Sequence, residues 1–195
     1  MTSGQVLWGL ANGVTVMALA GAFWIGVGLA VTFSETPWAI ASITALQLSG
    51  LAALVVAAHR LRRRSGFTRR DLRRDDPQTR RIVVGFRWAA LMEFVLVGSA
   101  VWLCRWFDRQ DLLWPGIALA ISLHFAPLGR MFFRPEYYMV SLLGSMIAVA
   151  LLPGPPGDWR LPWLGSGMAV LMWGCSVYLL ARSDRLAARA VGRTS

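Results

Sequence analysis

The sequence contains no lysine, only two cysteines and only two histidines among its 195 residues. Without lysine, a retinal Schiff base or a lysine-dependent enzyme is excluded. Cys104 and Cys175 lie in apolar stretches without CxxC spacing, which argues against a disulfide framework or a cysteine-based metal site. Because the apolar stretches also contain few carboxylates, we expect no metal ion and no cofactor.

Charged residues are scarce as well, at 15% of the chain, and they are gathered in blocks between long apolar runs. Hydrophobic residues make up 56% of the chain, and the mean hydropathy is +0.51. Runs of about 18 or more apolar residues are typical of membrane-crossing helices. A membrane β-barrel is disfavoured, because its strands would alternate apolar and polar residues. The predicted fold class is therefore all-α.

The apolar runs predict one domain, a bundle of six transmembrane helices. Each run has about 18 to 28 residues, enough to cross a hydrocarbon core of about 30 Å with some tilt. The first run is too long for the apolar region of a signal peptide, so we expect an uncleaved span. The predicted spans are residues 6–33, 37–58, 82–106, 112–132, 135–152 and 161–181, with a basic loop at 59–81 and a basic tail at 182–195.

The arginines predict the orientation of these spans. Of the 20 basic residues, ten follow the second span, two follow the fourth and four follow the sixth. By the positive-inside rule these ends face the cytoplasm, so both termini are predicted to be cytoplasmic. The net charge of +10 then reflects topology rather than nucleic acid binding. The expected partners are the lipid bilayer and its anionic headgroups, which attract arginines near the surface.

Two ionisable residues lie inside the predicted spans: Glu93 in the third and His124 in the fourth. Each lies about 12 residues from the outer end of its span, so both are about 18 Å deep at 1.5 Å per residue. The short connection predicts antiparallel neighbours, in which the two side chains can meet. Two interpretations stay open: a proton relay or ligand anchor, and a buried polar pair that fixes helix packing.

Two side-chain amides, Asn12 in the first span and Gln47 in the second, are also candidates for the site. Serine and threonine hydroxyls in a helix commonly bond back to their own backbone, so they need no further role. An unpaired amide in lipid, by contrast, costs several kcal/mol. We therefore expect Asn12 and Gln47 to line the same interior pocket as Glu93 and His124.

The junction between the fourth and fifth predicted spans contains two prolines. Pro127 has no backbone N–H and is expected to bend the fourth span, whereas Pro135 suits the first turn of the fifth. Four side chains around this junction are expected at headgroup level, where they either bind an anionic headgroup or anchor the chain at the interface. These residues are Arg130, Arg134, Tyr137 and Tyr138.

Residues 124–138 have the pattern His-Phe-x-Pro-Leu-x-x-x-Phe-x-x-Pro-x-Tyr-Tyr. This pattern resembles an uncharacterised bacterial family of six-span membrane proteins, grouped as a domain of unknown function. The resemblance implies the six-helix fold over most of the chain, and no activity or cofactor. Together with the arginine distribution, it predicts a multi-pass protein of the bacterial cytoplasmic (inner) membrane.

The sequence has no phosphate-binding loop, dinucleotide fingerprint, Gly-x-Ser-x-Gly elbow or HExxH motif, so a conventional enzyme is not expected. Three functions stay open. The first is a small proton-linked transporter or channel that uses Glu93 and His124. The second is a membrane-embedded protein that binds a lipid or a partner without transport or catalysis, and the third is an intramembrane lipid enzyme. The glycines of the first span, including Gly9 and Gly13, predict close packing within the chain or a homodimer.

Overall fold

The computed structural model describes residues 3–32, 37–66, 77–132, 134–152, 159–185 and 188. Over these ranges the chain is helical and contains no strand, which confirms the all-α prediction. A short 3₁₀ helix, η2 (Gln110–Leu112), precedes the fourth long helix. The long helices are α1 (Ser3–Thr32), α2 (Pro37–Arg64), α3 (Pro77–Trp106), α4 (Leu113–Phe132), α5 (Pro135–Ala150) and α6 (Arg160–Ala181).

Five of these helices, all except α5, are long and apolar enough to cross a membrane, which fits a multi-pass membrane protein. Helix α5 begins at the predicted residue, Pro135, but it has only 16 residues. A perpendicular crossing needs about 20 residues. The sequence after Leu152 is Pro-Gly-Pro-Pro-Gly, which cannot continue a helix. The structure therefore supports five of the six predicted crossings.

The helices next to the predicted basic loop extend further than the predicted spans. Helix α2 continues to Arg64, and α3 already begins at Pro77. A helix satisfies its own backbone hydrogen bonds, so it does not have to end where the hydrocarbon ends, and proline is well suited to a first helical turn. The prediction of a loop over 59–81 is therefore too long at both ends.

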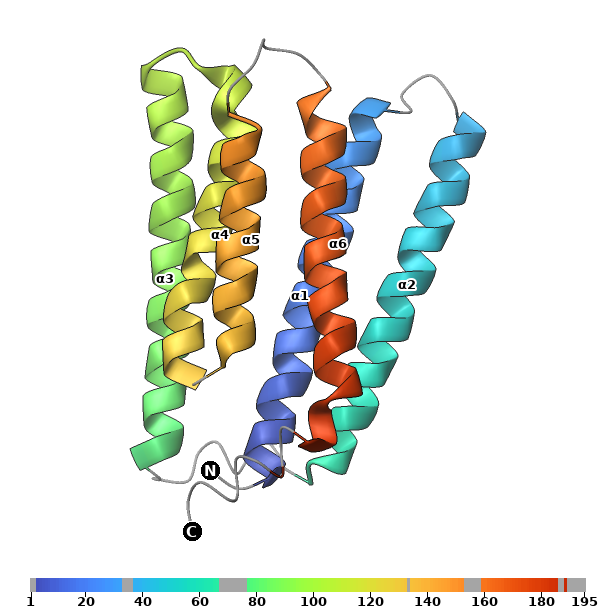
Figure 1. The fold of residues 1–195 in the computed structure, drawn as a ribbon, viewed down its shortest axis with the longest axis vertical. Coiled ribbons are helices and arrows are strands. Elements are labelled where there is room, and N and C mark those ends of the chain that lie inside the picture. The colour runs from blue at the N-terminus through green and yellow to red at the C-terminus, as the bar shows by residue number, and fades with distance from the viewer. Residues whose placement is uncertain are drawn as a thin grey trace.

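The helices form a row in the order α2, α1, α6, α5, α4, α3 (Figure 1). Helices α1, α2 and α6 form one three-helix unit, and α3, α4 and α5 form another. The two units meet mainly where α5 packs against α6. Helices α2 and α3, which are consecutive in the chain, lie at opposite ends of the row, and α3 packs chiefly against α4.

Helices α2, α4 and α6 end on the same side of the bundle, and the other three long helices begin there (Figure 1). We call this side the arginine-rich end. The arginines at these helix ends are Arg62, Arg63, Arg64, Arg130 and Arg182.

Glycines bring α1, α2 and α6 into close contact. The Trp173 ring of α6 lies against Gly21 of α1 and Gly50 of α2, and a Cβ atom on Gly50 would be only 2.6 Å from it. A Cβ atom on Gly165 of α6 would lie 2.8 Å from the Cα atom of Gly28. Most of the glycines of α1 are thus used for packing within the chain. They no longer favour the predicted homodimer, which stays a prediction.

Candidate functional site

The structure brings Glu93 of α3 and His124 of α4 together. The His124 Nε2 atom lies 3.8 Å from the Glu93 Oε2 atom, within ion-pair range but beyond an ordinary hydrogen bond. The two side chains differ in exposure: 9% of the histidine side chain is accessible and 39% of the glutamate side chain. One member of the pair is therefore buried, and the other is reachable from outside the bundle.

A second contact of the imidazole determines which nitrogen carries the proton. The His124 Nδ1 atom lies 2.6 Å from the carbonyl oxygen of Ile121, one turn earlier in α4. Because a carbonyl oxygen only accepts, Nδ1 must be the protonated nitrogen. In the neutral ring, Nε2 then presents a lone pair to Glu93. An ionised carboxylate also only accepts hydrogen bonds, so the two facing atoms do not attract each other. One added proton, on either Nε2 or the carboxylate, makes the contact attractive.

Small side chains allow α3 and α4 to approach each other around this pair. Ala89, one turn before Glu93, and Ala120, one turn before His124, are both buried. Nearer the opposite end, a Cβ atom on Gly116 would lie 3.5 Å from the Cβ atom of Ala100. The polar pair is therefore embedded in a helix contact made mainly of small residues, as in other closely packed membrane helices.

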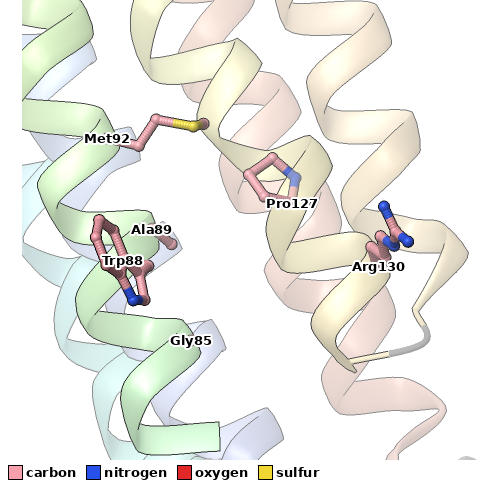
Figure 2. Close-up of a pocket in the computed structure, with 6 residues that line it drawn as sticks. All are labelled: Gly85, Trp88, Ala89, Met92, Pro127 and Arg130. Carbon is pink, nitrogen blue, oxygen red and sulfur yellow. The ribbon is translucent and has the colours of Figure 1, made fainter. Parts of the chain in front are cut away.

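An open groove of about 380 Å³ lies between α3 and α4 beside the pair. Its wall is almost entirely apolar, and Arg130, whose guanidinium is directed away from α3, is the one charged residue that lines it (Figure 2). Ala89 and Pro127 of this wall lie one helical turn from Glu93 and His124, on the side of the arginine-rich end. The residues that line the groove are Gly85, Trp88, Ala89, Met92, Pro127 and Arg130.

Asn12 and Gln47 do not join this site. The Asn12 Oδ1 atom accepts a hydrogen bond of 2.5 Å from Arg62 Nη2, and Gln47 Nε2 donates one of 2.5 Å to the Ala22 carbonyl. Both amides thus connect α1 with α2. The prediction of one shared pocket was based on the cost of an unpaired amide, and that cost is avoided here by local partners instead.

Three of the predicted headgroup residues gather where α4 meets α5. The Arg134 N–H donates a hydrogen bond of 3.0 Å to the Gly129 carbonyl, which closes the turn. The Tyr138 ring covers Gly129, because a Cβ atom there would lie 2.9 Å from the ring. Arg130 is exposed in the last turn of α4. The two arginines and Tyr138 therefore lie at the arginine-rich end.

Tyr137 departs from the expectation that it faces the headgroups. It is buried, and its ring stacks on Phe125 of α4 with a centroid distance of 6.2 Å. Its hydroxyl group lies against Gly13 of α1, where a Cβ atom would be 2.5 Å away. Adjacent residues of a helix point in directions about 100° apart, which here turns Tyr137 inward and Tyr138 outward. Tyr137 packs the two three-helix units together.

An ionic cluster that was not predicted from the sequence lies at the opposite end of the bundle. Arg109 contacts Asp111 through two hydrogen bonds, of 3.0 Å from Nε and 3.1 Å from Nη2. The Asp111 carboxylate also lies 3.5 Å from Nη1 of the buried Arg160, which begins α6. The hydrogen bond to Asp111 raises the pKa of the Arg109 guanidinium. The signal in the sequence was the presence of opposite charges at the helix ends that lie away from the arginine-rich end.

Comparison with known proteins identifies no relative: no protein-family model, curated protein or solved structure matches the chain. The resemblance to an uncharacterised six-span family is still a prediction. Within the part of the chain that the structure describes, no group of three or more His, Cys, Asp or Glu side chains is arranged to hold a metal ion. The function is therefore inferred from the geometry of the Glu93–His124 pair and the adjacent groove.

Proposed function

We propose that this protein is a small proton-linked membrane transporter in which Glu93 and His124 bind and release one proton. The observation that carries the proposal is the orientation of His124. Its Nδ1–H is bonded to Ile121, so Nε2 faces the Glu93 carboxylate at 3.8 Å. Both facing atoms are acceptors until a proton arrives, which makes the pair a proton-binding site within the bundle.

The unequal exposure of the pair supports proton exchange rather than a purely structural role. His124 is fixed and buried, whereas 39% of the Glu93 side chain is accessible. In the proposed cycle the proton enters and leaves through the carboxylate while the imidazole stays in place. Uptake changes the pair from a net charge of −1 to neutral, and charge is expensive in a low-dielectric interior. Protonation thus changes the strength of the contact between α3 and α4.

The proposal includes six crossings of a bacterial cytoplasmic membrane with both termini in the cytoplasm. The clustering of arginines at one end of the bundle supports this orientation. The 16 residues of α5 cover about 24 Å. This length falls short of about 30 Å of hydrocarbon, and membranes accommodate such a mismatch by local thinning at modest cost.

The test is proton flux into liposomes that contain the full-length protein and a pH-sensitive dye. Glu93→Gln removes the titratable carboxylate, and His124→Ala removes the facing nitrogen. We expect each to lower the flux at least about tenfold, since a positioned acid or base typically contributes more than that to proton transfer. Matched controls are His59→Ala, the other histidine, and Ser99→Ala, an exposed polar residue of α3. Unchanged flux in both site variants would refute the proposal.

A second function, lipid binding without transport, is favoured by the apolar groove between α3 and α4. A binding protein needs a lipid-accessible recess but no path for protons. It therefore predicts that wild-type liposomes have the same proton flux as empty ones. The same assay thus decides between the two functions before any variant is made.

A further inference from the structure

The groove between α3 and α4 has the dimensions and surface of an acyl-chain site. Apart from one arginine, its wall is formed mainly by carbon-rich side chains, which attract an apolar chain and offer a polar solute few hydrogen bonds. From Gly85 to Met92 it extends about 10 Å along α3. That length is about a third of the hydrocarbon thickness, enough for the upper part of one lipid tail.

The polar end of the groove is a cationic side chain. Arg130 is exposed in the last turn of α4, at the arginine-rich end. Within the part of the chain that the structure describes, it forms no ion pair, since the three charged contacts found involve other residues. A planar guanidinium with five donors is suited to phosphate oxygens. Arg130 lines the end of the groove, and its long, exposed side chain can therefore turn to an anion that enters there.

We infer that this groove binds one anionic phospholipid, with an acyl chain between α3 and α4 and the phosphate at Arg130. The order of polar and apolar parts in the site matches that of a lipid in the leaflet at the arginine-rich end (Figure 2). Trp88, which is 66% exposed, lines the same groove, and tryptophan prefers the boundary between tail and headgroup.

The charge of the site selects an anionic lipid over a zwitterionic one. Arg134 lies at the same turn as Arg130, because its N–H is bonded to Gly129. Positive charge at this turn repels the ammonium group of phosphatidylethanolamine, whereas phosphatidylglycerol carries only negative charge. The preference therefore comes from both attraction and repulsion.

The inference does not depend on the proposed proton transport. Neither Glu93 nor His124 lines the groove. Glu93→Gln should therefore retain the lipid while it loses proton flux. If the wild-type protein transports protons but shows no lipid preference, only the lipid site is refuted. If it shows the lipid preference but no proton flux, only the transporter is refuted.

The experiment is native mass spectrometry of the full-length protein, released from phosphatidylethanolamine nanodiscs that contain increasing amounts of phosphatidylglycerol. We expect one phosphatidylglycerol to be retained in preference to phosphatidylethanolamine. Arg130→Gln should weaken this binding about fivefold, the effect of one arginine near an anionic surface. Arg63→Gln, which removes an exposed arginine of α2 at the same end, should change it less than about twofold.

Two further variants test the apolar part of the site. Ala89→Trp fills the groove and should abolish retention of the lipid, whereas Ala53→Trp places the same ring on the exposed side of α2 and should not. Gly85→Leu fills the groove with less disturbance of the α3–α4 contact, so it replaces Ala89→Trp if that variant does not fold. Equal retention in the wild type, Arg130→Gln and a folded groove-filling variant would overturn the inference.

A free fatty acid has the same chemistry as an acyl chain with an anionic head, so oleate is added in competition. We expect phosphatidylglycerol to stay bound when oleate is present at the same concentration. Displacement of phosphatidylglycerol by oleate under these conditions would assign the groove to a free fatty acid and overturn the phospholipid assignment.

Discussion

The two three-helix units of this protein are held together in different ways. In the α1/α2/α6 unit, glycines let the helices touch, and polar side chains bond across helices to backbone or side-chain partners. In the α3/α4/α5 unit, a glycine, Gly144, also lets α5 approach α4, but α3 packs chiefly against α4 through small residues and the Glu93–His124 contact, with a groove beside it. The first unit has the properties of a scaffold, and the second has those of a site.

This contrast suggests how a small membrane protein can combine stability with a functional site. Membrane helices gain little from hydrophobic association, because lipid tails are as apolar as their side chains. Close glycine contacts and hydrogen bonds between helices therefore stabilise one unit. The other unit has a long polar contact of 3.8 Å and an open groove, both of which a ligand or a proton can alter.

The largest effect is expected from Gly165→Leu in the scaffold unit. The new Cβ atom would lie 2.8 Å from the Gly28 backbone, and backbone atoms cannot move aside as a side chain can. We expect destabilisation of more than about 3 kcal/mol, seen as loss of monodisperse protein in detergent. The control is Gly98→Leu in α3, where nothing lies within 4 Å of an added Cβ atom, and it should fold normally. If both variants are equally monodisperse in detergent, the close glycine contacts do not stabilise the α1/α2/α6 unit.

A smaller effect is expected from Trp173→Phe. The indole Nε1 donates a hydrogen bond of 3.0 Å to the Ala18 carbonyl, so phenylalanine keeps much of the packing and loses this bond between α6 and α1. We expect a loss of about 1 to 2 kcal/mol in the free energy of unfolding, measured by denaturation in mixed micelles. Trp163→Phe removes an indole that is 69% exposed on the same helix and serves as the control. If Trp163→Phe is just as destabilising, the Trp173 hydrogen bond is not what joins these helices.

The smallest effect on stability is expected from Glu93→Gln in the site unit. Its contact with His124 is longer than a hydrogen bond, so its loss should change the free energy of unfolding by no more than about 0.6 kcal/mol, the average for a polar contact between membrane helices. The same micelle denaturation assay measures this, with Ser99→Ala as the reference. A loss of 2 kcal/mol or more would mean that the pair serves mainly to fix helix packing.

The fold was predictable where the reason is local. Apolar runs and prolines placed the starts of α2 and α5 at Pro37 and Pro135, as observed. The end of α2 at Arg64 was not predictable from hydropathy, because a helix can continue into the arginine-rich interface. The contact between Glu93 and His124 could be expected because the two residues lie at equal depth and the short connection between α3 and α4 makes these helices neighbours.

The partners of Asn12, Gln47 and Tyr137 could not be predicted in this way. Which helices touch depends on the order of the row, and sequence separation does not determine it: α1 packs closely against α6, at the far end of the chain. Tyr137 faces inward because Gly13 of a distant helix leaves room for its hydroxyl group. The Tyr137–Gly13 contact joins residues more than a hundred positions apart, and the contacts of Asn12 and Gln47 depend on how α1 is rotated against α2.

The sequence by itself determined that the chain is helical, that it fits a membrane, and where most of its helices begin. These properties follow from apolar content and backbone chemistry, which act within each segment. Only the tertiary structure decided that Nδ1 of His124 is occupied by Ile121, that Nε2 faces Glu93, and that an apolar groove with an arginine lies beside them. The physical reason is that side-chain direction and the gaps between helices depend on packing across the whole bundle, which no single segment specifies.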